Sequence, residues 1–444
     1  MSSVEDKFTK IGMIIPHILM PRRDVDLHKW AVVACDQYTS EPEYWSSVAQ
    51  EVGSAPSTLN LIFPEVYLED EDKDQRIERI NSAMEEYLAQ GILEDQSQAF
   101  FLVQRHTPEA APRWGLMAAL DLEQYDFSKD STSLIRATEG TILDRIPPRK
   151  QIRKNASIEL PHIMVLIDDP EKTVIEPCTA DTSTFQKVYD FELMKNGGHI
   201  TGYKIEDEDN LHRIADALHK LADPAAFSKK YGAEEVLLFA MGDGNHSLAT
   251  AKAVWEDVKQ EYSGDKDVMQ HPARWALVEI ENIYDKGLVF EPIHRVLFNS
   301  DFNQFSSELE KIGSVEFTAL SSTDEVMKRV ASDDTQHIIG YVDAERIGVF
   351  TVKNPNSTIA AGTAQEAIDA LVQRESTSVD YIHGQGATET LGRKDGNIGL
   401  FLPALDKSDF FRTVIHDGAL PRKTFSMGEA NEKRYYVEAR KIKE

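Results

Sequence analysis

The sequence predicts an α+β protein built from two or three packed subdomains. Helical and strand-like segments alternate along the chain, but without the regular strand–helix order that a doubly wound parallel sheet requires. A length of 444 residues exceeds what a single ordinary core accommodates. The composition, 41% hydrophobic and 28% charged, is that of a folded globular protein.

The first half of the chain contains one clear helical pattern followed by several strand patterns. Apolar residues recur at helical spacing over residues 74–90, and Gly91 is a plausible stop. Strand patterns occupy residues 99–103, 114–120, 162–167 and 236–240. The last of these is continuously apolar, as in a strand buried on both faces. Asn210 is expected to cap a helix whose apolar stripe includes Leu211, Ile214 and Leu218.

The second half shows the same mixture. Ser322-x-x-Glu325 and Thr363-x-x-Glu366 have the form of capping boxes, which predicts helices at about 323–331 and 364–374. Strand-like runs are found at 337–342, 347–352 and 397–402. Ser408 is expected to cap a helix over 409–415, which Gly418 ends.

The net charge narrows the class of partner. The 48 Lys and Arg residues against 75 Asp and Glu residues give −27. A surface this acidic repels a nucleic-acid backbone, although a local basic site can still bind a small phosphorylated ligand. Two cysteines, the absence of a long apolar run and an N-terminus without the features of a signal peptide lead us to expect a cytoplasmic protein without membrane segments.

A glycine-flanked turn is the feature most suggestive of chemistry. The segment Met241-Gly-Asp-Gly-Asn-His-Ser247 follows the strand pattern and precedes a strong helix former. Gly242 and Gly244 allow a sharp turn that brings backbone N–H groups close to a ligand. Asn245, His246 and Ser247 would then present an anion site at the helix N-terminus, while Asp243 holds a metal ion or orients His246. The alternative is an ordinary strand-to-helix turn with Asn245 as the cap.

A local excess of basic residues lies between Leu134 and Lys154. Its cations are Arg136, Arg145, Arg149, Lys150, Arg153 and Lys154, against the two acids Glu139 and Asp144. Arginine forks bind phosphate or carboxylate through two parallel hydrogen bonds, which indicates a phosphorylated ligand. Glu139, between two threonines and beside Gly140, is a candidate general base. A basic helix that balances the acidic remainder is the alternative.

The C-terminal tail from Leu420 to Val437 is also basic. Arg422, Lys423, Lys433 and Arg434 could close over an anionic ligand, or belong to a final strand with a solvated face. Asp380 and His383 form a weaker acid–histidine pair on a strand-like segment. The sequence contains no P-loop, no dinucleotide-binding Gly-x-Gly-x-x-Gly after a strand, no His-Glu-x-x-His and no Gly-x-Ser-x-Gly.

These residues together resemble the domain-of-unknown-function family 1015 over nearly the whole chain. The resemblance is carried by Ile135-Arg-Ala-Thr-Glu-Gly-Thr-Ile-Leu-Asp-Arg-Ile-Pro-Pro-Arg149, Glu159-Leu-Pro-His-Ile-Met-Val165, Gly242-Asp-Gly-Asn-His-Ser247, Glu291-Pro-Ile-His-Arg295 and Leu420-Pro-Arg-Lys-Thr-Phe-Ser-Met-Gly428.

The turn is also similar to the Asp-Gly-His turn of the ParB and sulfiredoxin-like superfamily, which includes free-serine kinases. The similarity implies a mixed-sheet core in which Asp243, Asn245, His246 and Ser247 hold nucleotide phosphates. A separate glutamate, for which Glu139 is the candidate, would deprotonate the serine hydroxyl. Ser247 stands where the superfamily commonly has arginine, so Arg136, Arg145 or Arg149 would replace that charge.

The leading hypothesis is therefore phosphoryl transfer between ADP or ATP and a small hydroxyl substrate, most readily free L-serine or O-phosphoserine, with Mg²⁺ placed by Asp243. The alternatives are a metal-dependent phosphatase or hydrolase that uses Asp243 and His246 as ligands, and a nucleotide-binding regulatory module without catalysis. We expect an N-terminal α/β portion over 1–125, a phosphate-binding core over 126–300 and a C-terminal α+β portion with the basic tail over 301–444. The sequence leaves the oligomeric state open.

Overall fold

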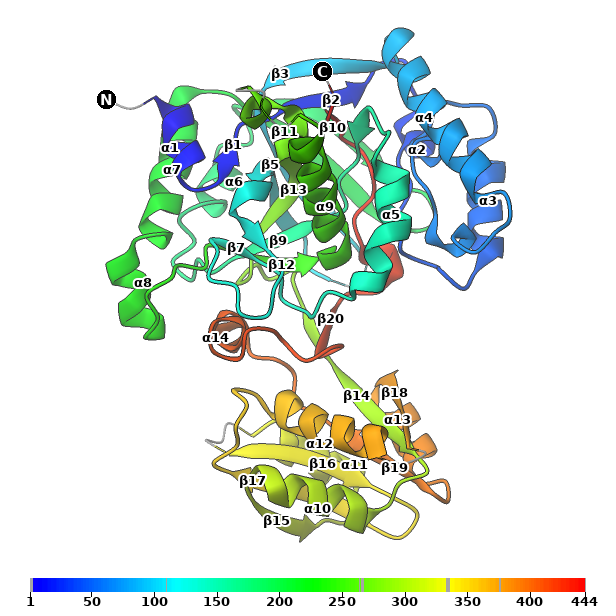
Figure 1. Cartoon of the computed structure of the whole chain (residues 1–444), viewed down its shortest axis with the longest axis vertical. Coiled ribbons are helices and arrows are strands. Elements are labelled where there is room, and N and C mark those ends of the chain that lie inside the picture. The colour runs from blue at the N-terminus through cyan, green and yellow to red at the C-terminus, as the bar shows by residue number, and fades with distance from the viewer. Residues whose placement is uncertain are drawn as a thin grey trace. The chain divides into compact units, whose positions relative to one another are not determined.

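A computed structural model describes residues 3–108, 110–262, 264, 267–332, 336–374 and 377–443 (Figure 1). The chain forms two compact units. Unit 1 comprises Met1–Leu288 and Gly428–Glu444, and unit 2 comprises Val289–Met427. The boundary expected at 125/126 does not coincide with a unit boundary, because strands from both sides of it pair within one sheet.

Unit 1 is built on a ten-stranded mixed sheet with the order β10-β11-β4-β5-β13-β9-β12-β7-β6, and with β1 paired to β5. Three pairs, β13–β9, β12–β7 and β6–β7, are parallel, and the others are antiparallel. The α+β class and the mixed sheet are thus confirmed. The strands are β1 (Met13–Ile14), β4 (Phe100–His106), β5 (Arg113–Asp121), β6 (Tyr125–Asp126), β7 (Ile135–Arg136), β9 (Met164–Ile167), β10 (Gln186–Glu192), β11 (His199–Ile205), β12 (Phe239–Asp243) and β13 (Trp275–Asn282).

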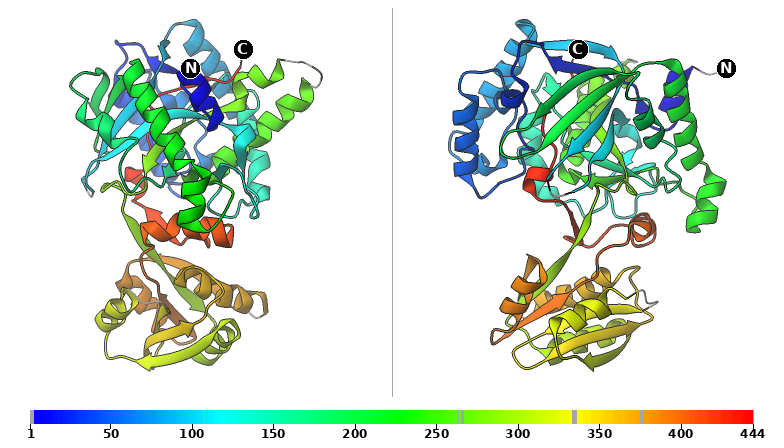
Figure 2. Two further views of the ribbon diagram at one scale, coloured as in Figure 1. Left: turned by 90° about the vertical axis from the view of Figure 1, so that its left-hand side faces the viewer. Right: turned by 180° about the vertical axis from the view of Figure 1, so that it is seen from behind.

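Both faces of this sheet are covered, because side chains alternate between two hydrophobic clusters. On β4, Phe100 and Leu102 join one cluster, whereas Phe101 and Val103 join the other. Figure 2 shows the helices over residues 42–52 and 73–89 on one side of the sheet and the helix over residues 208–221 on the other. The helices of the first cluster include α1 (Val4–Lys10), α7 (Glu208–Leu221) and α9 (Asn245–Glu261), and those of the second include α2 (Leu27–Trp30), α3 (Pro42–Val52) and α4 (Lys73–Ala89).

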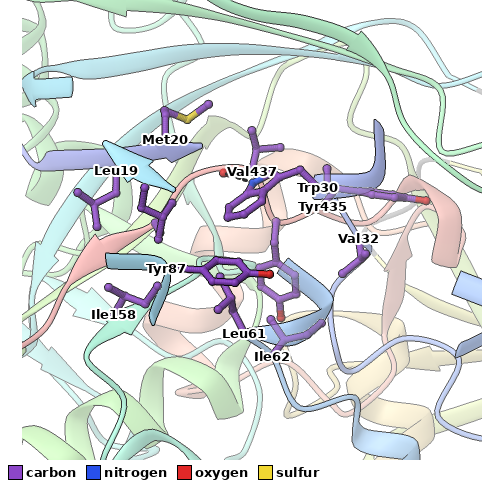
Figure 3. Close-up of a cluster of buried hydrophobic side chains, with 14 of the residues drawn as sticks. Leu19, Met20, Trp30, Val32, Leu61, Ile62, Tyr87, Ile158, Tyr435 and Val437 are labelled. Carbon is purple, nitrogen blue, oxygen red and sulfur yellow. Dashed lines mark hydrogen bonds between the residues drawn. The ribbon is translucent and has the colours of Figure 1, made fainter. Parts of the chain in front are cut away.

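The C-terminal segment after unit 2 runs through the second cluster (Figure 3). The indole N–H of Trp30 donates to the Val437 carbonyl at 2.9 Å. Further along, β21 (Arg440–Lys441) pairs with β8 (Ile158–Glu159), and Arg440 Nε lies 2.7 Å from Glu159 Oε1. The remaining elements of unit 1 are β2 (His17–Pro21), β3 (Leu93–Gln98), α5 (Ile146–Arg153), α6 (Glu176–Ala180) and α8 (Pro224–Tyr231).

Unit 2 has its own sheet, in which every pairing is antiparallel. The order is β15-β17-β16-β19-β14-β18, with β20 paired to β14. Aromatic rings of Phe302, Phe317, Tyr341 and Phe350 pack together in its core. Its elements are β14 (Phe290–Phe298), α10 (Phe302–Ile312), β15 (Ser314–Ala319), α11 (Thr323–Val330), β16 (His337–Val342), β17 (Ile347–Lys353), α12 (Ala360–Arg374), β18 (Ser378–His383), α13 (Gln385–Gly392), β19 (Asn397–Phe401), α14 (Lys407–Asp417) and β20 (Phe425–Met427).

The predicted elements are found, with several ends displaced. Asp207 caps α7 in place of Asn210, and Asp406 caps α14 in place of Ser408. Helix α12 begins before Thr363, and β12 begins at Phe239 and not at Val236. On β18, Asp380 is three residues from His383, so the two point to opposite faces and do not form a pair. Within the described ranges, no helix combines the length and apolar character needed to cross a bilayer.

Candidate functional site

The glycine-flanked turn is the junction between β12 and α9 in unit 1. The strand ends at Asp243, after a bulge opposite Met164 of β9. Gly244 has φ +83°, and a Cβ there would lie 3.1 Å from Ile163 Cα, so the position requires glycine. Gly244 is the N-cap of α9 and supplies no side-chain cap. The first-turn N–H groups of Asn245, His246 and Ser247 therefore form an uncapped helix end that suits an anion.

The segment that contains Glu139 lies directly against this turn. The Thr138 backbone N–H donates to Asn245 Oδ1 at 3.0 Å, and its hydroxyl donates to the Met241 carbonyl at 2.6 Å. Four residues later, the Ile142 N–H donates to His246 Nε2 at 3.3 Å. Glu139 is partly buried between these two attachments. The structure thus brings the candidate base and the turn together.

His246 is neutral at physiological pH. Burial, followed by the positive charges of Arg145 and Arg149, lowers its pKa to about 4. Because its Nε2 accepts the hydrogen bond from Ile142, the proton of the neutral ring is assigned to Nδ1. His246 therefore holds the 138–142 segment against the helix end, and its Nδ1–H is a hydrogen-bond donor.

The three arginines expected to bind phosphate have different environments. Arg136 is buried, and its guanidinium donates to the carbonyls of Ser133 at 2.7 Å and Glu235 at 3.0 Å. Arg149 is paired with the Glu65 carboxylate through two hydrogen bonds, of 2.7 and 2.5 Å. Arg145 is exposed at the C-terminal end of the 3₁₀ helix η4 (Leu143–Arg145). We accordingly retain Arg145 in the candidate site and assign structural roles to Arg136 and Arg149.

The C-terminal segment contributes a cation to the turn. Lys433 Nζ lies 3.0 Å from Asp243 Oδ2, and Asp243 Oδ1 accepts the Gly244 N–H at 2.9 Å. Burial alone would raise the pKa of Asp243, but the Lys433 ammonium outweighs it and holds the pKa below its usual value. The basic tail is divided between the units, since Arg422 and Lys423 belong to unit 2. Only a tertiary structure could single out Lys433 among these four cations.

A loop from the N-terminal part completes the surroundings. The Ala34 N–H donates to the Arg434 carbonyl at 2.9 Å, and the Cys35 N–H donates to the Tyr436 hydroxyl at 3.1 Å. The same hydroxyl lies 2.7 Å from His162 Nδ1. The next residue, Asp36, is a carboxylate whose charge acts on His246. Sequence reasoning missed Asp36, although a polar residue directly after the apolar run 31–35 was a usable signal.

The described residues contain no group of three or more His, Cys, Asp or Glu side chains that could hold a metal ion. Asp243 offers one carboxylate, whose two oxygens already contact Gly244 N–H and Lys433. Magnesium in nucleotide sites is commonly held by one or two carboxylates together with substrate phosphates. Asp243 therefore fits an ion that arrives with a nucleotide better than a resident ion in a protein cage.

Four stretches of chain thus meet at the N-terminus of α9: the turn 242–247, the segment 138–145, the loop 34–37 and the tail residues 433–436. They combine uncapped N–H groups, a neutral histidine, the ion pair of Lys433 with Asp243, and two further carboxylates, Asp36 and Glu139. Such a set can bind a negatively charged group and accept a proton from a neighbouring hydroxyl.

Comparison with known proteins gives one family and several solved structures. The profile of the family described as "Protein of unknown function (DUF1015)" matches residues 19–372. No curated protein matches the sequence. A conserved hypothetical protein from Pyrococcus furiosus is 10% identical, with 74% of this chain and 95% of that chain covered and a TM-score of 0.34. Free serine kinase in complex with AMP is 9% identical, with 74% and 91% covered and a TM-score of 0.35. A mutant of free serine kinase in complex with ADP is 10% identical, with 74% and 92% covered and a TM-score of 0.36.

Proposed function

This chain belongs to the DUF1015 family, and from its site we propose that it binds ADP or ATP at the N-terminus of α9 and transfers a phosphoryl group to or from a small hydroxyl substrate. The observation that carries the proposal is the arrangement of Lys433 and the 138–142 segment around an uncapped helix end. Free L-serine and O-phosphoserine are the first substrates to test, because the turn resembles that of free-serine kinases.

The phosphates are proposed to lie against the first-turn N–H groups of Asn245, His246 and Ser247. The helix dipole and the Lys433 ammonium favour negative charge at this position, and the exposed Arg145 adds a second cation. Magnesium bound to the nucleotide would neutralise phosphate charge, and the Asp243 carboxylate would help to hold it. Phosphoryl transfer requires mainly positioning and charge neutralisation, which these residues can provide.

The proton of the substrate hydroxyl requires an acceptor. Glu139 is held beside the turn by the hydrogen bonds of Thr138 and Ile142. Asp36 approaches His246 from the loop 34–37. We assign the general base to Glu139, because its segment is hydrogen-bonded directly to the phosphate-binding turn, and we treat Asp36 as the competing carboxylate.

Turnover with both carboxylate variants tests this proposal. Purified protein would be incubated with Mg²⁺, L-serine and either ATP or ADP, and separately with Mg²⁺, O-phosphoserine and either ADP or AMP, while ³¹P NMR follows both directions. We expect Glu139→Gln to lose at least about a hundredfold in kcat while it keeps its nucleotide affinity. Asp36→Asn should lose less, and Glu78→Gln, an exposed carboxylate on α4, should match the wild type.

The outcomes separate the alternatives. No turnover and no nucleotide binding would contradict the proposal. Tight nucleotide binding without turnover, unchanged by Glu139→Gln, would indicate a regulatory module. Release of inorganic phosphate that needs metal but no nucleotide would indicate a phosphatase. The geometry disfavours a metal-dependent phosphatase, because both proposed metal ligands already have partners: Asp243 is paired with Lys433, and His246 Nε2 accepts a hydrogen bond from the Ile142 N–H.

A further inference from the structure

Two neighbouring hydrophobic side chains are exposed beside the candidate site. Ile142 is 48% exposed and Leu143 is 64% exposed. Of the large hydrophobic residues in the described part of the chain, no other two consecutive ones are both exposed. Isolated exposed apolar residues are ordinary, but an adjacent pair at the edge of a polar site indicates contact with an apolar surface.

The position of the pair relates it to the phosphate-binding turn. The backbone N–H of Ile142 is hydrogen-bonded to His246, which lies in the first turn of α9. Leu143 begins η4, the 3₁₀ helix that ends at the exposed Arg145. The two residues therefore join, along the chain, the backbone contact with the first turn of α9 to the exposed Arg145.

We propose that Ile142 and Leu143 form the platform on which the base of the bound nucleotide rests. The inference depends on the proposed function, because it starts from phosphates at the α9 N-terminus. A nucleotide combines charged phosphates with a flat base that has apolar faces, and the site combines an uncapped helix end with an exposed apolar pair in the segment hydrogen-bonded to it. Ligand sites typically combine a few polar anchors with apolar contacts of this kind.

The platform also has a consequence for specificity. Aliphatic side chains contact the face of a base and do not read the hydrogen-bonding groups on its edge. ADP and GDP should therefore bind with affinities within a few-fold of one another. The smaller ring of a pyrimidine covers less of the platform, so CDP should bind more weakly.

A ligand with a base and a ligand without one distinguish the contribution of the base to the affinity from that of the phosphates. Calorimetric affinities for Mg²⁺–ADP and for Mg²⁺–pyrophosphate would be measured on the full chain and on the double variant Ile142→Ser/Leu143→Ser. We expect about a tenfold loss for ADP, from the apolar contact removed, and no change for pyrophosphate. The control is Tyr262→Ser, an exposed hydrophobic residue at the other end of α9, about 25 Å away.

A variant with a fluorescent side chain at the platform tests the proposal even where the double serine variant fails to fold. Leu143→Trp should change its fluorescence with ADP but not with pyrophosphate. Equal loss of both ligands in the double variant, or unchanged ADP affinity, would overturn the platform alone. Unchanged ADP affinity combined with loss of a dimer in sedimentation would show that the pair contacts a second copy instead. Failure of the wild type to bind either ligand would overturn the proposed function and the platform together.

Discussion

At the scale of single residues, the ion pair between Lys433 and Asp243 connects the end of the chain to the turn at its centre. The two side chains are 15% and 28% exposed, so water screens their attraction only in part. The pair neutralises a carboxylate that would otherwise repel phosphate from the helix end. Lys433 thus has two roles in the proposed site, as the partner of Asp243 and as a cation facing the ligand.

Replacement of Lys433 tests both roles. Lys433→Met should weaken Mg²⁺–ADP binding by at least about tenfold, because a cation is lost and an uncompensated carboxylate remains. Lys433→Arg should retain most of the affinity, since it keeps the charge. Isothermal titration calorimetry gives the affinities, and equal values for wild type and Lys433→Met would rule out a role for this ammonium.

The lowered pKa of His246 predicts a specific pH dependence of stability. Because the pKa is about 4 in the folded protein and near 6.5 when unfolded, the unfolded chain takes up the proton first as the pH falls. His246 therefore reduces the free energy of unfolding progressively from pH 6.5 to 4, by up to about 3 kcal/mol, and by less where water reaches the ring. Above pH 6.5 it contributes no pH dependence.

Urea unfolding at pH 4.5, 5.5 and 7 measures this effect. The variant His246→Asn lacks the titrating ring but keeps a side-chain oxygen for the Ile142 N–H, so its stability should change less over this range. Parallel curves for variant and wild type would show that His246 titrates normally in the folded state. The carboxylates elsewhere contribute equally to both curves and cancel in the difference.

The sequence identified two segments that lie in contact in the structure, but it did not identify the partners of their side chains. The turn and the Glu139 segment are in contact, as the phosphate hypothesis requires. The sequence could not show that Glu65 neutralises Arg149, because 84 residues separate them. Nor could it show that Arg136 is buried against carbonyls, because an arginine looks equally available in any basic segment.

At the scale of elements, the C-terminal segment is fixed by buried charge. Arg434 is paired with Glu279 of β13 and with Glu438, and all three side chains are almost inaccessible to water. Arg434 is next to Lys433, so the two ion pairs on Arg434 also restrict where Lys433 can reach. A buried cation of this kind is costly to leave unpaired, and so are its partners.

Removal of the buried guanidinium should therefore destabilise unit 1. We expect Arg434→Met to lower the free energy of unfolding by about 3–5 kcal/mol, because two buried carboxylates lose their counter-ion. Arg422→Met is the matched control, since Arg422 is 66% exposed and its contact with Asp369 is 3.3 Å, so its loss should cost about 1 kcal/mol or less. Chemical denaturation gives both values, and similar costs for the two variants would contradict a structural role for the buried pairs.

The predicted elements show where local patterns are sufficient. The apolar spacing over 74–90 predicted α4, because a single helix face buries Ile77, Ile80 and Met84. The predicted cap of α7 was wrong, because Asp207 and Asn210 are both good capping residues three positions apart, and the side chain of Asp207 accepts the Asn210 N–H. Local sequence therefore identifies a helix better than it identifies its first residue.

At the scale of the whole chain, unit 2 is an insertion between β13 and the last segment of unit 1. The sequence predicted several of its strands and helices but not this arrangement, because nothing local indicates that residues 428–443 return to the first sheet. The expected portion 301–444 combined residues that belong to two cores. Only the long-range pairing of β21 with β8, and of Arg440 with Glu159, reveals the division.

Two separate cores predict two unfolding transitions. Differential scanning calorimetry should resolve one unfolding transition for each unit. Mg²⁺–ADP should shift only the transition of unit 1 to higher temperature, because it raises the free energy of unfolding of that unit by about 2.7 kcal/mol at a ligand concentration one hundred times Kd. Phe350→Ala removes a fully buried ring from the aromatic core of unit 2. It should lower the temperature of the unit 2 transition alone, because the free energy of unfolding of that unit falls by about 3–5 kcal/mol. If instead one transition responds to both the ligand and the variant, the two units unfold cooperatively, and residues of unit 2 would then influence nucleotide binding through the stability of the C-terminal segment.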